Sequence, residues 1–214
     1  TQRFFNFQRL VDFLNVVGYQ PGSFDTKQSM PGPQDTGPGV ALNGKIYIFG
    51  GTEAGTVTDR VLEYDPVADA YATADPIPYG PVRGASAVAV GNIAIVCGGA
   101  AGIDPGLPTN ATYSFDPAQP SGSQWTELAD MPYARYGAAI AYFDDVNGYY
   151  AGIGFSKDLI FVVGGKDWYG VNQDTTLIYG VTPDQWDDSL ISLLPRPRVW
   201  AGAAAINDTL FLTG

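Results

Sequence analysis

The chain has 214 residues, enough for one large domain with a sizeable core, and 45% of them are hydrophobic. Its formal net charge of −11 would repel a phosphate backbone, which argues against nucleic-acid binding, and no apolar run is long enough to span a membrane. The chain has no histidine and a single cysteine, so it lacks the commonest general base, a disulfide framework and a thiolate zinc site.

Glycine and proline shape the expected fold. The 27 glycines and 16 prolines are spread along the sequence rather than clustered. This distribution is typical of many short strands joined by turns, so an all-β fold is predicted. The lone thiol, Cys97, lies inside an apolar run and is interpreted as a small buried hydrophobe.

Residues 1–39 carry the weakest pattern. The stretch "VDFLNVVGYQPGSFDTKQSMP" can be overlaid on "RVLEYDPVADAYATADPIP" further along the chain, because both have a strand, a turn with proline, an aromatic residue and a closing proline. We therefore expect the outer two strands of a four-stranded unit here. A short helix from Leu10 to Val17 is the alternative.

From residue 40 onward the sequence repeats. Four apolar runs end on glycine: "IFGG" at 48–51, "IVCGG" at 95–99, "FVVGG" at 161–165 and "FLTG" at 211–214. The first glycines lie 48, 66 and 50 residues apart. Repeats of about 50 residues indicate a β-propeller, in which each blade is a four-stranded antiparallel sheet.

The other landmarks recur in the same order within each repeat. A strand of small residues comes first, as in Ala85–Val90, and the second strand ends on the glycine pair. The third strand ends on an aromatic residue, and the fourth begins near a second one. These aromatic residues are Tyr64, Phe115 and Tyr179 for the third strand, and Tyr71, Trp125 and Trp186 for the fourth.

Taken together, these residues resemble the kelch repeat. The resemblance rests on the glycine pairs, the Tyr/Phe-Asp-Pro at 64–66 and 115–117, the spaced tryptophans and the Pro-x-x-Arg of Pro132–Arg135, and it covers roughly 40–214. It implies a kelch-type β-propeller. Two departures are visible: "QDTGPG" at 34–39 stands where the other repeats have an arginine, and no Asp-Pro follows Tyr179.

The repeats also give the domain organisation. We expect kelch repeats at 40–79, 80–131 and 132–194 and a partial one at 195–214, preceded by the segment 1–39. About three full blades and two half blades result. Since kelch propellers usually have six or seven blades, a partial propeller is expected, and a closed ring of four is the alternative. The 66-residue interval is explained by an insertion at about 144–157, between the first two strands of its blade.

Three arginines are candidate binding residues: Arg83, Arg135 and Arg198 recur where one blade passes to the next. Those linkers and the loops after the glycine pairs share one face of a propeller. The resemblance to peptide-binding kelch proteins implies that convergent guanidinium groups could bind a carboxylate or an acidic peptide there. The alternative is that each arginine bonds to a neighbouring acid or carbonyl and only holds the ring together.

Aromatic loop residues are further candidates. Trp168, Tyr169 and Asn172 follow the third glycine pair, where they could stack on a sugar or anchor a partner, and ordinary loop packing is the alternative. The insertion should project from the opposite face. Its aromatic residues, Tyr149, Tyr150 and Phe155, suggest contact with another chain.

Two asparagines match the N-glycosylation pattern: Asn110 in "NAT" and Asn207 in "NDT". Aspartates at 144–145 and at 184, 187 and 188 lack the full ligand spacing of a calcium loop, so no metal site is predicted. No nucleophile elbow, phosphate loop or Cys-His pair is present, and no catalytic residue or cofactor is predicted either.

We therefore expect a non-catalytic binding or scaffolding propeller whose partners are other protein chains, with an acidic peptide or a glycan as possible ligands. The acidic pI near 4.1 and the two sequons favour an extracellular or cell-surface setting, and a cytoplasmic one is the alternative. A second hypothesis is the propeller part of a larger carbohydrate-active or galactose oxidase-like enzyme. Its catalytic residues would lie outside this segment.

Overall fold

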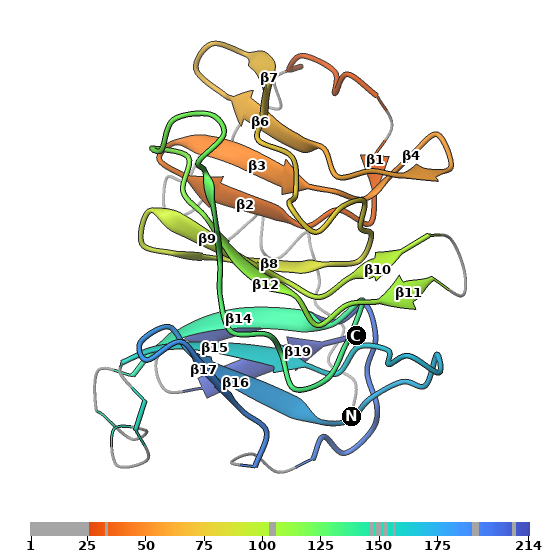
Figure 1. The fold of residues 1–214 in the computed structure, drawn as a ribbon, viewed down its shortest axis with the longest axis vertical. Coiled ribbons are helices and arrows are strands. Elements are labelled where there is room, and N and C mark those ends of the chain that lie inside the picture. Colours follow the sequence, from red (N-terminus) through yellow and green to blue (C-terminus); the bar gives the residue numbers. More distant parts are fainter. Residues whose placement is uncertain are drawn as a thin grey trace, which may run out of the picture.

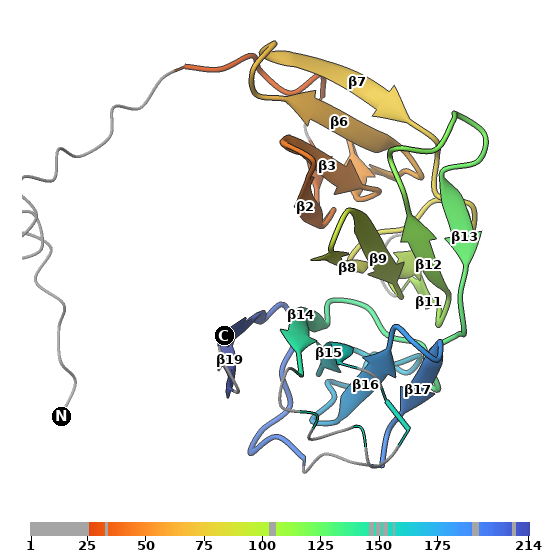
Figure 2. The same cartoon turned by 90° about the vertical axis from the view of Figure 1, so that its left-hand side faces the viewer.

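The computed structural model describes residues 26–214, except 33, 103–105, 146–147, 149–150, 152–153, 156, 190–192 and 207–208. Three four-stranded antiparallel sheets follow one another along the chain, and a two-stranded hairpin comes last. Figure 2 shows that the sheets fan out as the blades of a propeller in an open arc, with β2, β8 and β14 inside and β7, β13 and β17 outside. The all-β propeller of four-stranded antiparallel blades expected from the sequence is confirmed.

Each blade uses its strands in chain order from the inside outward (Figure 1). Blade 1 comprises β2 (Gly39–Leu42), β3 (Lys45–Phe49), β6 (Val61–Asp65) and β7 (Ala70–Ala74). Blade 2 comprises β8 (Ser86–Val90), β9 (Ile93–Cys97), β12 (Thr112–Phe115) and β13 (Trp125–Glu127). Blade 3 comprises β14 (Ala139–Asp144), β15 (Asp158–Val163), β16 (Thr176–Gly180) and β17 (Gln185–Asp187).

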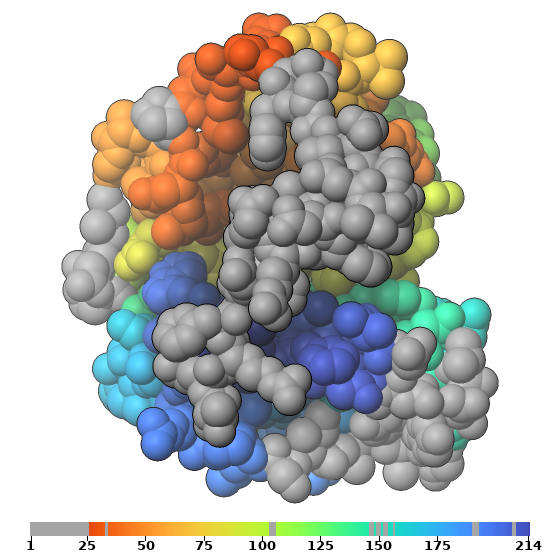
Figure 3. Space-filling model, turned by 180° about the vertical axis from the view of Figure 1, so that it is seen from behind, coloured from red at the N-terminus to blue at the C-terminus, as the bar shows by residue number. Residues whose placement is uncertain are grey.

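The remaining strands are short or lie at the end of the chain. The final hairpin pairs β18 (Gly202–Ile206) with β19 (Thr209–Thr213). Two small sheets lie in the loops: β1 (Gln34–Asp35) with β4 (Thr52–Glu53) and β5 (Thr56–Val57), and β10 (Ala100–Ala101) with β11 (Leu107–Pro108). Seen from behind, the orange first blade and the blue C-terminal strands occupy opposite halves of the molecule (Figure 3). The preceding half blade expected from the sequence falls mainly at 1–25, outside the described residues.

The core lies between the blades. Phe49 of β3 contacts Phe115 of the next blade edge to face, with ring centroids 5.3 Å apart, and Trp125 at 5.7 Å. A second cluster joins blade 2 to blade 3 through Cys97, Ile160 and Tyr179. Because Cys97 is only 1% exposed, burial raises the pKa of its thiol to about 12. Between blades 1 and 2, large aromatic residues thus fill the space between the sheets.

The repeated tryptophans also connect blades through hydrogen bonds. The indole N–H of Trp125 donates to the carbonyl oxygen of Asp75 at 3.0 Å, and that of Trp186 donates to Ala129 at 2.7 Å. Each acceptor lies in the linker that leaves the previous blade. A tryptophan at this position therefore covers the hydrophobic gap and satisfies a linker carbonyl at the same time.

The glycine pairs end the second strands because the next linker packs directly against them. At the second pair, Gly98 and Gly99 have φ of 65° and 94°. A Cβ atom on Gly98 would lie 2.5 Å from the carbonyl oxygen of Arg135. The amide of Gly99 donates to that same oxygen at 2.7 Å. Only glycine permits both the backbone conformation and the close approach.

The insertion lies between β14 and β15, as the sequence indicated. Phe155 does not serve there as an exposed contact with another chain, since it is 6% exposed and packs in its own blade. A Cβ on Gly180 would lie 2.3 Å from its ring, so the ring covers a strand position that has no side chain. Tyr149 and Tyr150 lie outside the described residues.

Candidate functional site

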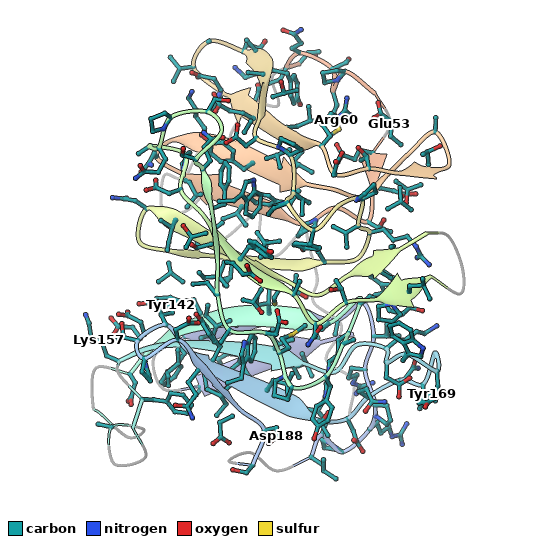
Figure 4. All side chains as sticks on the ribbon, viewed as in Figure 1. Glu53, Arg60, Tyr142, Lys157, Tyr169 and Asp188 are labelled. Carbon is teal, nitrogen blue, oxygen red and sulfur yellow. The ribbon has the colours of Figure 1, made fainter. Side chains whose placement is uncertain are left out.

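The loops that follow the glycine pairs lie together on one face of the propeller. The β4–β5 and β10–β11 hairpins and the 164–175 loop all lie at the right of Figure 1. The linkers between blades enter on the same face, because they precede the innermost strands. In Figure 4, Tyr169 marks this loop face, and Lys157, at the end of the insertion, marks the opposite one. We call the surface formed by these loops and linkers the loop face.

The three arginines lie on the loop face but not at equivalent positions. The second glycine of each pair donates its N–H at 2.7 Å to a linker carbonyl, and the three acceptors are Val82, Arg135 and Arg198. Arg83 therefore stands one residue out of register with the other two arginines. The sequence pattern grouped Arg83 with the other two arginines because each lies in a linker between blades. The pattern did not show which linker residue contacts the glycine pair.

Arg135 is a structural residue in this arrangement. Its side chain is 3% exposed, and one terminal nitrogen donates to the carbonyl oxygens of Gly164, at 2.9 Å, and Thr175, at 3.1 Å. The other terminal nitrogen donates to the Thr175 hydroxyl. Burial lowers the pKa of Arg135. This guanidinium therefore bonds to carbonyl and hydroxyl oxygens of blade 3.

In the earlier blades, side chains of other types donate to the carbonyl oxygen of the first glycine. In blade 1 the amide of Gln34 donates to the carbonyl oxygen of Gly50. In blade 2 the hydroxyl of Tyr79 donates to Gly98 at 3.3 Å. The carbonyl of the first glycine thus receives a side-chain donor in blades 1, 2 and 3, and "QDTGPG" supplies a glutamine where blade 3 uses an arginine. Sequence reasoning missed Gln34 and Tyr79, because three different residue types share one role.

Arg83 lies between the linker that enters blade 3 and the loop that follows the second glycine pair. Its guanidinium carbon is 5.5 Å from the centroid of the Tyr136 ring, and its Nε donates to the carbonyl oxygen of Gly102 at 2.9 Å. Trp200 contacts the same tyrosine edge to face, with ring centroids 6.2 Å apart. Arg198 is half-buried, and its backbone N–H donates to Gln173 at 3.0 Å. The described contacts therefore do not converge the three guanidinium groups on one ligand position.

The loop after the third glycine pair presents its aromatic residues to solvent. Trp168 is 57% exposed, Tyr169 87% and Val171 55%. Asn172 is also exposed, and its backbone pairs with Lys166. The loop is held from within by Asp167. Its carboxylate accepts the backbone N–H groups of Tyr169, at 2.8 Å, and Val171, at 2.9 Å, and the side-chain amide of Gln173, at 2.8 Å.

A hollow of about 370 Å³ lies beside this loop, at the loop-face end of blade 3. It is lined by Tyr133, Arg135, Asp167, Gln173, Thr175, Leu177 and Asp188. Leu177 is fully buried, whereas Tyr133 is 54% exposed. A hydrogen bond to Asp188 raises the pKa of the Tyr133 hydroxyl. Among these residues only Arg135 was predicted, because the others come from three segments that nothing in the sequence links.

The remaining predicted positions have defined surroundings. The side-chain amide of Asn110 donates to the carbonyl oxygen of Met131 at 3.1 Å, so attachment of a glycan would have to replace this bond. Asn207 lies outside the described residues. Asp184 accepts from Tyr179 and Ala129, while Asp187 accepts from Ser189. In the described ranges, no three acidic or cysteine side chains gather closely enough to hold a metal ion.

The comparisons with known proteins address the fold. Residues 38–73 match the family model described as the Kelch motif, which covers blade 1. No curated protein matches the sequence. The solved "Structure of YjhT" is similar over 87% of this chain, with a TM-score of 0.68 and 19% sequence identity, and the match covers 60% of that chain. The chain thus spans about three fifths of that protein's length.

Within the described residues, no helix is long and apolar enough to cross a membrane.

The Kelch motif matches blade 1, and the landmarks of that motif recur in blades 2 and 3. Each of these blades is a four-stranded antiparallel sheet. The chain therefore folds as a β-propeller of four-stranded blades, and its first blade carries a Kelch motif.

Proposed function

We propose that this propeller is a non-catalytic binding or scaffolding module that recognises another protein chain through its loop face. A kelch propeller is suited in general to act as a protein-interaction scaffold. Blades packed on one another form a rigid support, and the loops at their ends are free to vary. The proposal assigns the contact to the loop at 164–175, with Trp168 and Tyr169 as its centre.

The observation that carries the proposal is a pair of exposed aromatic side chains on a loop that is already ordered. Aromatic residues are enriched among the few that dominate binding energy at protein interfaces. Ordering a loop on binding costs free energy, and the three hydrogen bonds to Asp167 remove part of that cost in advance. Trp168 and Tyr169 thus have the composition and rigidity expected of a binding surface.

We also propose an extracellular or cell-surface setting. Its support is the acidic composition and the two sequons. Since the amide of Asn110 is engaged in a hydrogen bond, we expect any glycan at Asn207 rather than at Asn110. Mass spectrometry of native material tests this. A glycan on Asn207 supports the setting, and two unmodified asparagines would remove its main support.

Affinity purification from the native source with the wild-type chain, under cross-linking, tests the binding function. A partner should be recovered by the wild type and lost with the double variant Trp168→Ala, Tyr169→Ala. Val67→Ala is the matched control, because Val67 is 94% exposed but lies in the β6–β7 turn on the opposite face. If the double variant recovers the same proteins as the control, this loop is not the binding surface.

A further inference from the structure

We propose that the hollow beside Tyr133 and Asp188 receives a lysine or arginine side chain of the partner protein. This inference rests on the proposed function and gives the partner a chemistry. It reverses the expectation of an acidic peptide, which depended on arginines presented to solvent. The lining of the hollow supports it in three ways: the charge it presents, the shape of its walls and its place beside the exposed aromatic loop.

The first support is charge. Arg135 lines the hollow, but its terminal nitrogens donate to Gly164 and Thr175 inside blade 3, and the side chain is 3% exposed. The carboxylates of Asp167 and Asp188 line the same hollow. In the described part of the chain, the ion pairs formed are Lys45–Glu63 within blade 1 and Arg60–Glu53 in the loops beside it. Figure 4 labels Arg60 and Glu53, which lie far from Asp188. Asp167 and Asp188 therefore form no ion pair in that part of the chain, and the hollow carries two carboxylates against the single guanidinium of Arg135.

The second support is the distribution of polar and apolar walls. Long basic side chains combine an apolar stem with a charged end, and they are bound best where both parts are accommodated. Leu177 is a buried apolar wall, and the Tyr133 ring stands at the exposed side, where it can cover a methylene stem or the face of a guanidinium. The Asp188 carboxylate lies close enough to the Tyr133 hydroxyl to raise its pKa, so both side chains face the exposed side of the hollow.

The third support is position. Asp167, which contributes to the hollow, is the residue whose carboxylate holds the exposed loop in place. A partner that covers Trp168 and Tyr169 therefore lies next to the hollow. The net charge of −11 would also favour the approach of a basic partner.

Side-chain analogues test the inference without knowledge of the partner. N-Butylguanidinium and n-butylammonium represent arginine and lysine, and neutral N-butylurea is the control ligand. Titrations followed by ¹H–¹⁵N NMR should show saturable shifts at the amides of Gln173, Thr175 and Asp188 with the cations and not with the urea. The cation that binds more tightly identifies the favoured side chain.

Asp188→Asn should weaken cation binding by about five-fold, as expected for loss of one partly exposed ion pair. Asp144→Asn is the matched control, because it makes the same charge change at an exposed position on the opposite face, at the end of β14, and should leave binding unchanged. The NMR spectrum of each variant shows whether it is folded. Equal binding by the wild type and Asp188→Asn, or equal binding of cation and urea, would overturn the inference.

The two proposals fail separately. If the partner captured through Trp168 and Tyr169 binds Asp188→Asn as tightly as the wild type, the basic side chain is wrong and the binding surface stands. If no protein depends on Trp168 and Tyr169, the proposed function is wrong, whatever the side-chain analogues do.

Discussion

The guanidinium of Arg135 donates to the carbonyl oxygen of Gly164 at 2.9 Å, so the linker entering blade 3 is fixed to the first glycine of that blade's own pair. The backbone carbonyl of Arg135 accepts from Gly99 of blade 2 at 2.7 Å. One residue thus joins two blades, with its backbone on one and its side chain on the other. Because its guanidinium is buried and bonded within blade 3, Arg135 holds blades 2 and 3 together rather than binding a ligand.

Arg135→Met should lower the free energy of unfolding by about 2–4 kcal/mol, because Gly164 and Thr175 lose their donor in a buried position. Chemical denaturation followed by tryptophan fluorescence measures the loss. Arg198→Met is the control at the equivalent position. Arg198 is half-buried, so its loss should not exceed about 1 kcal/mol. Equal losses in the two variants would show that the buried hydrogen bonds of Arg135 contribute little.

Gly98→Ala should destabilise the fold by about 3–5 kcal/mol, the sum of an unfavourable left-handed conformation and overpacking against Arg135 and Met131. Gly91→Ala separates the two causes. Gly91 has a similar φ of 59°, but a Cβ atom added there would meet nothing within 4 Å, so only the conformational cost of about 1–2 kcal/mol applies. Thermal unfolding of both variants gives the difference, and no difference would rule out the steric role of the linker.

Asp75→Asn should remove a pH-dependent part of the stability. Hydrogen bonds from the Ser121 hydroxyl, at 2.7 Å, and from the amides of Gln124 and Gly122 lower the pKa of Asp75. A carboxyl group with a lowered folded pKa stabilises the fold above its unfolded pKa of about 4. That stability is lost as the pH falls through the lower folded pKa.

Melting temperatures of the wild type and Asp75→Asn between pH 7 and pH 2 measure this effect. The wild type should have the higher melting temperature at neutral pH, and the difference between the two melting temperatures should disappear below about pH 4. A difference that stays constant down to pH 2 would mean that the Asp75 carboxylate does not contribute through its charge.

Asp167→Ala should loosen the aromatic loop without unfolding the blades. The amides of Tyr169 and Val171 lose their acceptor, so their hydrogen exchange should become faster by about 5–10-fold. NMR-detected exchange measures both amides, and Asp187→Ala, which removes only the acceptor of Ser189, should leave them unchanged. Exchange in the wild type at the rate of an unstructured peptide would show that the loop is not held in advance.

The strand order could be predicted from the sequence because its signals are local. A glycine pair fixes positive φ, and the aspartate of Asp65-Pro66 accepts the next turn's amides, from Val67 at 2.8 Å and Ala68 at 3.0 Å. Such features mark the end of a strand wherever they occur, and their repetition gives the order of the strands within each blade. The place of the insertion between β14 and β15 followed from the same count.

The surroundings of individual side chains could not be predicted in this way. Phe155 was expected to be exposed because it lies in an insertion, yet it is buried over Gly180. Arg83 and Arg135 share a pattern, but a shift of one residue gives one a contact with Tyr136 and the other a place inside blade 3.

The sequence by itself thus determined the fold class, the strands and the face on which the linkers and loops gather, because each depends on backbone conformation set by neighbouring residues. Only the tertiary structure decided that the Arg135 side chain is bonded within blade 3 and holds two blades together. It also decided that Tyr133, Asp167 and Asp188 line one hollow. The physical reason is that these residues meet through the packing of a linker, a loop and a strand end. Their distances in space are set by how blades stack and not by their separation along the chain.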